Sequence, residues 1–187
     1  MIYVISGTNR PASRSREVSD WVADNMKKYT RDVEVIDLAD LPLHELIGDH
    51  YDKNTDLPSP IRKTIDKINH SDGLVLVVPE YNGSFPGSLK YFIDFWSYPK
   101  SFEYRPVAFI GLGYRWGGLR PVEQMQQIFN YRNAFIFPER VFLTNIEDVL
   151  KNKKIADKDI KKLLDRQARN FVKFINGLKT QDFTSSP

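Results

Sequence analysis

Six consecutive residues, Gly73-Leu74-Val75-Leu76-Val77-Val78, carry no polar side chain and show no alternation of apolar and polar positions. A strand with one face in water alternates, so a continuous apolar run of this length is typical of a strand covered on both faces. Helices packed on both sides of a parallel sheet provide such cover. The run therefore predicts the central strand of a parallel sheet.

Strand-like runs and helix-like segments alternate along the rest of the chain. Short runs rich in β-branched and aromatic residues predict further strands at 2–6, 33–36, 106–112 and 134–143, the last interrupted by Pro138. Parallel neighbours need crossover connections, and right-handed crossovers place helices on both faces of the sheet. The alternation predicts an α/β fold, a doubly wound sandwich around a five-stranded parallel sheet of order 2-1-3-4-5.

Apolar residues recur at helical spacing after each strand. They are Val18, Trp21, Val22, Met26 and Tyr29; Ile61, Ile65 and Ile68; Leu89, Phe92, Ile93 and Trp96; Val122, Met125, Ile128 and Phe129; and Leu163, Leu164, Phe171, Val172, Ile175 and Leu178. Residues 37–60 are turn-rich and end in Ser59-Pro60, which predicts an N-cap followed by proline in the first helical position. Charges of both signs alternate over 151–162, which predicts the polar start of the closing helix.

A length of 187 residues with 41% hydrophobic content fits one domain, expected over 1–179, with a flexible tail at 180–187. The absence of cysteine excludes disulfides, thiolate metal sites and a cysteine nucleophile. No apolar stretch approaches the roughly 20 residues of a membrane span, and no leader pattern is evident. We therefore expect a soluble, cytoplasmic protein with no membrane partner.

Charge and histidine placement argue against two further classes of partner. The net charge of +3 is spread among interleaved acids, which favours a solvated surface and predicts no nucleic-acid partner. His44, His50 and His70 share no ligand spacing, so no metal site is expected.

Two polar loops leave strongly apolar strands at the place where this topology binds ligands. In a sheet of order 2-1-3-4-5 the crevice opens at the carboxyl ends of the first and third strands. The loops that follow those strands are 7–15 and 79–87, and both are punctuated by glycine and proline. The coincidence predicts a ligand site between them.

The first of these loops is rich in hydrogen-bond donors. The stretch SGTNRPASRSRE combines Arg10 with the hydroxyls of Thr8, Ser13 and Ser15, just before a predicted helix N-terminus. Helix N-termini bind anions through free N–H groups, so a phosphate monoester is one expected ligand. Equally, Ser13 or Ser15 can simply cap the helix while the arginines are solvated. The loop alone leaves both interpretations open.

Other motifs carry less information. There is no G-x-x-x-x-G-K-[ST] loop, and Gly111-x-Gly113 lacks the third glycine of a dinucleotide fingerprint, so this loop is interpreted as one whose backbone approaches a flat ligand. Glu80 could act as a base, but a structural ion pair or a subunit contact is favoured. Trp96, Tyr98, Phe102 and Tyr104 are interpreted as core or interface residues rather than as a ligand box.

Three motifs in order give the chain its resemblance to a known family. A strand followed by G-[ST]-x-R-x-x-S occurs at 7–13, P-E-Y-N-G-S-x-P-G-x-L-K at 79–90, and a G-G-x-R turn at 117–120. Together they resemble the NADPH-dependent FMN reductase family of flavodoxin-like quinone, azo-dye and chromate reductases. The resemblance extends from residue 1 to about residue 177, and the second motif is the most specific.

The resemblance implies a flavodoxin-like FMN-binding domain that passes hydride from NADPH or NADH to flavin N5 and on to quinones or similar small electrophilic acceptors. The protein then positions the rings, so no catalytic side chain is implied. A homodimer or homotetramer is also implied, with the aromatic stretch 92–104 offering apolar surface. Cofactor contacts are implied for Thr8, Asn9, Arg10, Ser13, Arg14 and Ser15 at the phosphate end, and for Pro79, Glu80, Tyr81, Asn82, Gly83, Gly113, Gly117 and Gly118 around the ring.

The chain departs from the family pattern at a few positions. Ser15 stands where asparagine is frequent, Arg14 replaces a frequently apolar residue, and Tyr91 stands where asparagine is usual. Arg115-Trp116 is bulky for the third loop and would narrow the face on which nicotinamide stacks. Two alternatives therefore stay open, a flavodoxin-type electron carrier and a non-enzymatic FMN-binding module. The basic charge argues against the carrier, since such proteins are usually strongly acidic.

Overall fold

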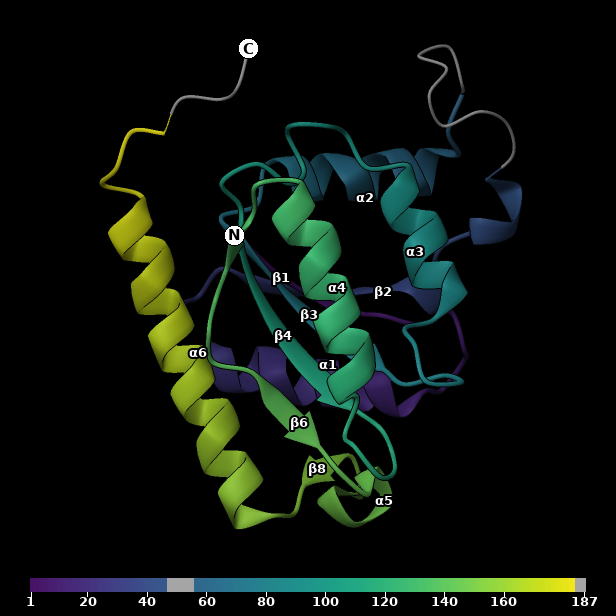
Figure 1. The fold of residues 1–187 in the computed structure, drawn as a ribbon, viewed down its shortest axis with the longest axis vertical. Coiled ribbons are helices and arrows are strands. Elements are labelled where there is room, and N and C mark those ends of the chain that lie inside the picture. The colour runs from purple at the N-terminus through teal and green to yellow at the C-terminus, as the bar shows by residue number, and fades with distance from the viewer. Residues whose placement is uncertain (47–55, 184–187) are drawn as a thin grey trace.

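The computed structural model describes residues 1–46 and 56–183 of the chain. Part of the predicted turn-rich segment 37–60 and the last residues of the predicted tail lie outside the described residues. Within the described part, Figure 1 shows strands at the centre of the molecule with helices around them.

The sheet is parallel and has the predicted order. Its strands are β1 (Ile2–Ser6), β2 (Val33–Asp37), β3 (Gly73–Pro79), β4 (Pro106–Leu112) and a fifth strand in two pieces, β5 (Phe135–Ile136) and β6 (Val141–Leu143). The strands lie in the order β2-β1-β3-β4-β5, and β6 also pairs with β4. The predicted flavodoxin-like α/β fold is therefore confirmed.

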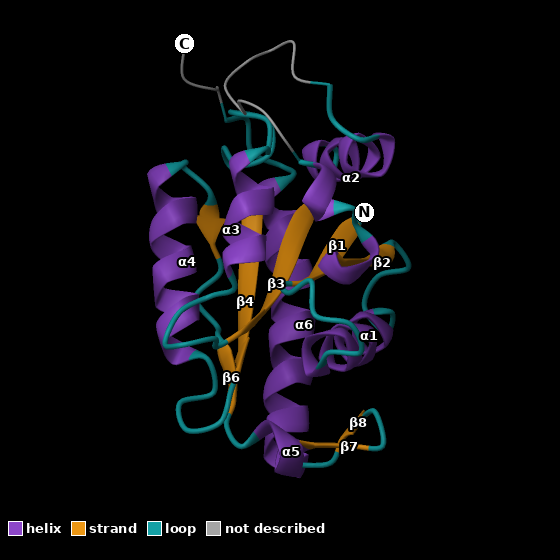
Figure 2. Ribbon diagram, turned by 90° about the vertical axis from the view of Figure 1, so that its right-hand side faces the viewer, coloured by secondary structure: helices purple, strands orange, loops and turns teal. Residues whose placement is uncertain are grey.

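Helices cover both faces of the sheet. They are α1 (Arg14–Met26), α2 (Ser59–Asn69), α3 (Gly87–Asp94), α4 (Leu119–Tyr131), α5 (Ile146–Val149) and α6 (Lys158–Leu178), with short 3-10 helices at Leu38–Asp40 and Leu43–Glu45. Figure 2 shows α4 and α6 on opposite sides of β4. None of the described helices is long and apolar enough to cross a membrane.

The central strand β3 is buried along its whole length, as its apolar run predicts. Leu74, Leu76 and Val78 contribute to a core with the apolar sides of α2, α3 and α4. Val75 and Val77 point the other way, into a second core with α1 and α6. Two cores, one on each face, explain why neither set of alternating positions is polar.

The predicted last strand is broken around Pro138, and a glutamine side chain donates hydrogen bonds at the break. The ladder to β4 stops at the Val107–Ile136 pair and resumes at the Ile110–Val141 pair. The buried Gln167 side chain, on α6, donates hydrogen bonds to the carbonyl oxygens of Phe109 (3.0 Å) and Glu139 (2.7 Å). Its amide thus satisfies carbonyl groups that the broken ladder leaves without a strand partner.

Three details of the sequence-based prediction are wrong. Pro58, not Ser59, occupies the N-cap of α2, so Pro60 is the second helical residue. This proline is tolerated because the first-turn N–H groups have no intrahelical acceptor. Two residues predicted to lie on helices lie beyond them: Tyr29 follows the end of α1, and Trp96 follows the end of α3, although Trp96 is buried as its apolar spacing predicted.

The third wrong detail is the start of the closing helix, which was predicted over 151–162. An antiparallel hairpin, β7 (Leu150–Lys151) and β8 (Lys154–Ile155), precedes α6, which begins only at Lys158. Asn152 and Lys153 form its two-residue turn with φ of 50° and 59°, the left-handed conformation that such tight hairpins require. The Asp157 side chain then caps α6 by accepting from the N–H groups of Asp159 and Ile160.

We predict that Gln167→Leu destabilises the fold by about 1–3 kcal/mol, because the buried Phe109 carbonyl and the partly buried Glu139 carbonyl lose their donor while the volume is nearly kept. Urea denaturation followed by circular dichroism measures this. Gln127→Leu, a matched change at an exposed position of α4, should leave the midpoint nearly unchanged. Equal midpoints for the two variants would show that the Gln167 amide does not support the broken strand.

Candidate functional site

A cavity of about 560 Å³ opens at the carboxyl edge of the sheet, a size typical of small-molecule sites. It lies at the predicted crevice, since β1 and β3 are hydrogen-bonded neighbours and both run toward it. Its lining comes from the two predicted loops, from the end of β4 and from the segment after β6: Arg10, Pro11, Ala12, Ser13, Arg14, Ser15, Pro79, Glu80, Tyr81, Leu112, Gly113, Tyr114, Ile146 and Glu147.

The first loop ends in the cap of α1, and this cap keeps donors for a ligand. The Ser13 hydroxyl accepts from the Arg16 N–H at 3.1 Å, and the Ser13 carbonyl accepts from the N–H groups of Arg16 and Glu17. The remaining first-turn N–H groups, those of Arg14 and Ser15, have no acceptor within the helix. Ser13 is therefore a helix cap, yet the helix N-terminus can still receive an anion.

A side-chain hydrogen bond joins the two predicted loops. The Thr8 hydroxyl lies 3.0 Å from the Tyr81 hydroxyl and also accepts from the Arg10 N–H at 3.2 Å. Thr8 is completely buried, so it does not line the cavity. It holds the first loop against the second and thereby fixes the width of the crevice.

The second loop turns back on itself at Asn82-Gly83. Tyr81 and Ser84 exchange two backbone hydrogen bonds, of 2.8 and 3.1 Å, around these two residues. The φ angles of Asn82 and Gly83 are 52° and 79°, as in the tight hairpin turn that the Asn-Gly pair favours. Neither residue lines the cavity, so their observed role is to direct Tyr81 toward Thr8.

Glu80 is engaged in an ion pair. Arg120, in the first turn of α4, donates to the Glu80 carboxylate at 3.2 Å, and the Glu80 side chain is only 15% exposed. The Arg120 guanidinium also lies 5.8 Å from the centre of the Trp116 ring. Of the interpretations considered for Glu80, the structural ion pair is the one observed.

The glycines of the third loop serve close packing of backbone. A Cβ atom built on Gly118, whose φ is 79°, would lie 2.6 Å from the Leu112 nitrogen. Gly118 therefore packs the start of α4 against β4, and Gly117 packs against the end of β6. Of the predicted glycines in this loop, only Gly113 lines the cavity. The Gly113 N–H donates to the Leu143 carbonyl, so a ligand would find backbone donors only further along the loop.

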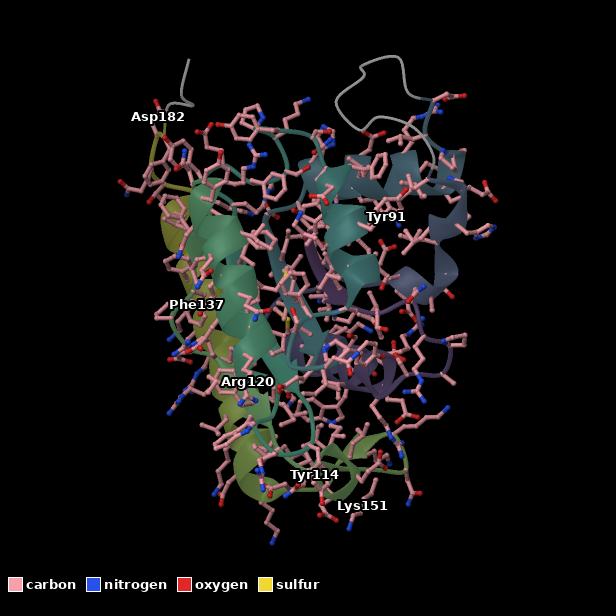
Figure 3. The ribbon with its side chains drawn as sticks, turned by 45° about the vertical axis from the view of Figure 1, so that its right-hand side comes forward. Tyr91, Tyr114, Arg120, Phe137, Lys151 and Asp182 are labelled. Carbon is pink, nitrogen blue, oxygen red and sulfur yellow. The ribbon has the colours of Figure 1, made fainter. Side chains whose placement is uncertain are left out.

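The third loop carries two exposed rings, of which Tyr114 lines the cavity. Tyr114 lines the cavity and is 81% exposed, and Trp116 is 50% exposed. Figure 3 shows Tyr114 at the same end of the molecule as Lys151 of the β7–β8 hairpin.

The structure adds cavity residues that the sequence did not single out. These added cavity residues are Leu112, Tyr114, Ile146 and Glu147, together with Pro11 and Ala12 of the first loop. Ile146 and Glu147 follow β6. The sequence signal that could have found them is that the carboxyl end of a fifth parallel strand lies at the same edge of the sheet as the cavity. Asn9, of the predicted set, does not line the cavity.

Arg14 meets one of these added residues. Its guanidinium donates to Glu147 from Nε at 3.2 Å and from Nη2 at 2.6 Å, and to Glu17 from Nη1 at 3.0 Å. The hydrogen bonds to Glu147, and then those to Glu17, raise the pKa of Arg14. The Arg14 charge is thus already paired inside the candidate site.

No cluster of three or more histidine or acidic residues that could hold a metal ion occurs in the described part of the chain. His44 and His70 are exposed, and His50 lies outside the described residues.

Comparison with known proteins identifies the family. The model of the NADPH-dependent FMN reductase family matches residues 1–148, and the matched region contains both predicted loops and the third loop. The chain belongs to the NADPH-dependent FMN reductase family. Relatives that match this chain are named as an NADPH azoreductase, an NADH-dependent flavin reductase subunit and a quinone reductase.

Individual relatives of this FMN reductase family member are distant. An NADPH azoreductase from Bacillus sp. (strain OY1-2) is 29% identical over 148 residues, 78% of this chain and 77% of its own length. A quinone reductase from Pseudomonas putida is 29% identical over 115 residues, 59% of each chain. The solved structure of FerB, a flavoenzyme NAD(P)H:(acceptor) oxidoreductase from Paracoccus denitrificans, superposes with a TM-score of 0.70 at 23% identity, covering 94% of this chain and 97% of FerB; it supports the fold.

We predict that Thr8→Val and Tyr81→Phe each destabilise the protein and that their effects are not additive, with a coupling energy of about 0.5–1.5 kcal/mol. Thermal or urea unfolding of both single variants and the double variant measures it. Tyr98→Phe, at a 53% exposed ring, serves as the control and should not change stability. Additive effects of Thr8→Val and Tyr81→Phe would mean that the hydroxyl pair does not join the loops.

Proposed function

We propose that this protein is an FMN-dependent NAD(P)H oxidoreductase that delivers electrons to quinones or similar small electrophilic acceptors. The observation that carries the proposal is the 560 Å³ cavity at the sheet's carboxyl edge, which combines a helix N-terminus with an apolar and glycine-lined wall. An anionic tail and a flat ring would find suitable surroundings at the two ends of one cavity.

The donor set fits a phosphate monoester. The donors are the free N–H groups at the start of α1, the Ser15 hydroxyl and the Arg10 guanidinium, and the residues that carry these donors, Arg10, Arg14 and Ser15, all line the cavity. Arg10 has no ion-pair partner among the residues that the structure describes, so its charge is available. We propose that these groups hold the phosphate of FMN.

The other end of the cavity fits a flat ring. Pro79, Leu112 and Gly113 bring backbone and apolar atoms to the wall, and the Thr8–Tyr81 hydrogen bond fixes the spacing of the loops. We propose that these residues, with Glu80 and Tyr81, border the isoalloxazine ring, and that the turn at Asn82-Gly83 supports Tyr81 from outside the cavity. Residues 113–118, with exposed Tyr114 and Trp116, would then orient the nicotinamide and the acceptor.

FMN, once bound, would supply the redox chemistry that links a nicotinamide donor to an acceptor. Residues of this chain bind, orient and exclude water, and hydride transfer needs no general base. The pairing of Glu80 with Arg120 agrees with this assignment, because the one carboxylate of the second loop is already used. The proposal therefore contains no catalytic side chain.

We also propose that the chain associates as a homodimer or homotetramer through the face of α3 and α4. A second cavity of about 940 Å³ lies there and extends from Ser84 and Phe85 of the second loop to the exposed Tyr98 and Tyr131. Phe92, Trp96 and Phe102 of the predicted aromatic surface are buried in the core, so they would support such an interface from beneath.

Spectroscopy and turnover test the proposal. Purified protein incubated with FMN should retain it after desalting, absorb as a yellow flavoprotein, and bleach when NADPH or NADH is added without oxygen. Menadione should then accelerate NAD(P)H oxidation. A protein that binds FMN but does not oxidise NAD(P)H would be an electron carrier or a binding module, and one that stays colourless with FMN would contradict the proposed cofactor.

We predict that Arg10→Ala weakens FMN binding roughly tenfold, because a charge-assisted contact to phosphate is lost. Riboflavin, which lacks the phosphate, should bind wild type and variant equally. Arg31→Ala, at an exposed position in the turn after α1, is the charge-matched control. Titration of flavin fluorescence gives all of these affinities, and an equal loss for riboflavin would show that Arg10 does not contact the phosphate.

A further inference from the structure

Glu147 brings a second carboxylate to the end of the cavity that holds the anion-binding groups. Arg14, the first residue of α1, is hydrogen-bonded on one edge by Glu147 and at its Nη1 atom by Glu17. Two carboxylates therefore surround one guanidinium, and this local group carries a net charge of −1. A phosphate monoester, itself carrying close to two negative charges at neutral pH, would meet this group at the helix N-terminus.

The position of Glu147 is fixed by backbone hydrogen bonds. The Asn145 N–H donates to the Tyr114 carbonyl at 2.7 Å, and the Ile146 N–H donates to the Gly113 carbonyl. Residues 145 and 146 are thus tied to the third loop, directly before Glu147. The β7–β8 hairpin follows α5, and Figure 1 shows α5 and β8 together at the end toward which β6 points. Glu147 lines the cavity, although it belongs to neither of the two predicted loops.

We propose that Glu147 competes with the flavin phosphate for Arg14 and so lowers the affinity of this site for phosphomonoesters, which favours exchange of the flavin. This inference rests on the proposed FMN site. Its physical basis is that Arg14 must give up hydrogen bonds to Glu147 to bind the phosphate fully, and that the carboxylate then stays close to the phosphate and repels it. Arg10 and the first-turn N–H groups would supply most of the net attraction.

A role of Glu147 in orienting Arg14 would have the opposite effect on FMN affinity. If Glu147 served to orient Arg14 so that its remaining N–H groups met the phosphate, removing the carboxylate would weaken FMN binding. The geometry favours competition, because Glu147 occupies the Nε–Nη2 edge, the fork that best matches two phosphate oxygens.

The test compares Glu147→Gln with a neighbouring charge change. Asp148→Asn removes the same charge one residue later, from a side chain that is 80% exposed, lies 3.9 Å from Lys151 and does not line the cavity. Wild type and both variants are titrated with FMN and with riboflavin by flavin fluorescence, at low and at high KCl. Thermal melting confirms that each variant is folded, as expected for substitutions of exposed side chains.

Competition predicts that Glu147→Gln binds FMN about three- to tenfold more tightly than wild type. Riboflavin affinity should not change, Asp148→Asn should change FMN affinity less than twofold, and high salt should shrink the gain. FMN affinity that is unchanged or lower in Glu147→Gln, or a gain that Asp148→Asn reproduces, would overturn the inference while leaving the FMN site intact. Failure of the wild type to bind either flavin would instead overturn the proposed function, and this inference with it.

Discussion

Burial of β3 on both faces is the constraint on which the rest of the structure depends. A strand with no polar position needs cover on each side, which helices provide here, and right-handed crossovers place those helices on both faces of a parallel sheet, whose observed order is β2-β1-β3-β4-β5. Parallel pairing in turn brings the carboxyl ends of β1, β3, β4 and β6 to one edge of the sheet. The cavity lies at that edge because the loops leaving these strands meet there, where the winding reverses.

The candidate site is built largely from backbone and from charges that are already paired. Glu80 is paired with Arg120, and Arg14 with Glu147 and Glu17, which leaves Arg10 as the cavity cation without a carboxylate partner in the described chain. Paired charges are compatible with chemistry supplied by a bound cofactor, because the side chains of such a site hold and orient rings rather than transfer protons. The pairing also means that a small change in it can change how tightly an anionic ligand is held.

The strand order, the buried central strand and the two main loops could be predicted from the sequence because each follows from a strong local pattern or from a topological rule. For Ile146 and Glu147 the sequence offered a topological signal alone, the carboxyl end of a fifth parallel strand, because a short polar stretch after a broken strand carries no periodic pattern. The β7–β8 hairpin was missed for a related reason: alternating charges fit a helix start as well as a tight turn at Asn152-Lys153. Gln167 lies on an otherwise ordinary amphipathic helix. Its role as hydrogen-bond donor depends on the strand break at Pro138, and no local sequence pattern links these two positions.

A crystal structure of the protein grown with excess FMN tests the central claim most directly. The account predicts the phosphate at the first turn of α1, within hydrogen-bond distance of the Arg14 and Ser15 N–H groups and of Arg10, with the flavin ring between the loops that follow β1 and β3. It would be contradicted if FMN bound elsewhere, for example in the groove between α3 and α4, or if side chains of the protein filled this cavity and no flavin entered it.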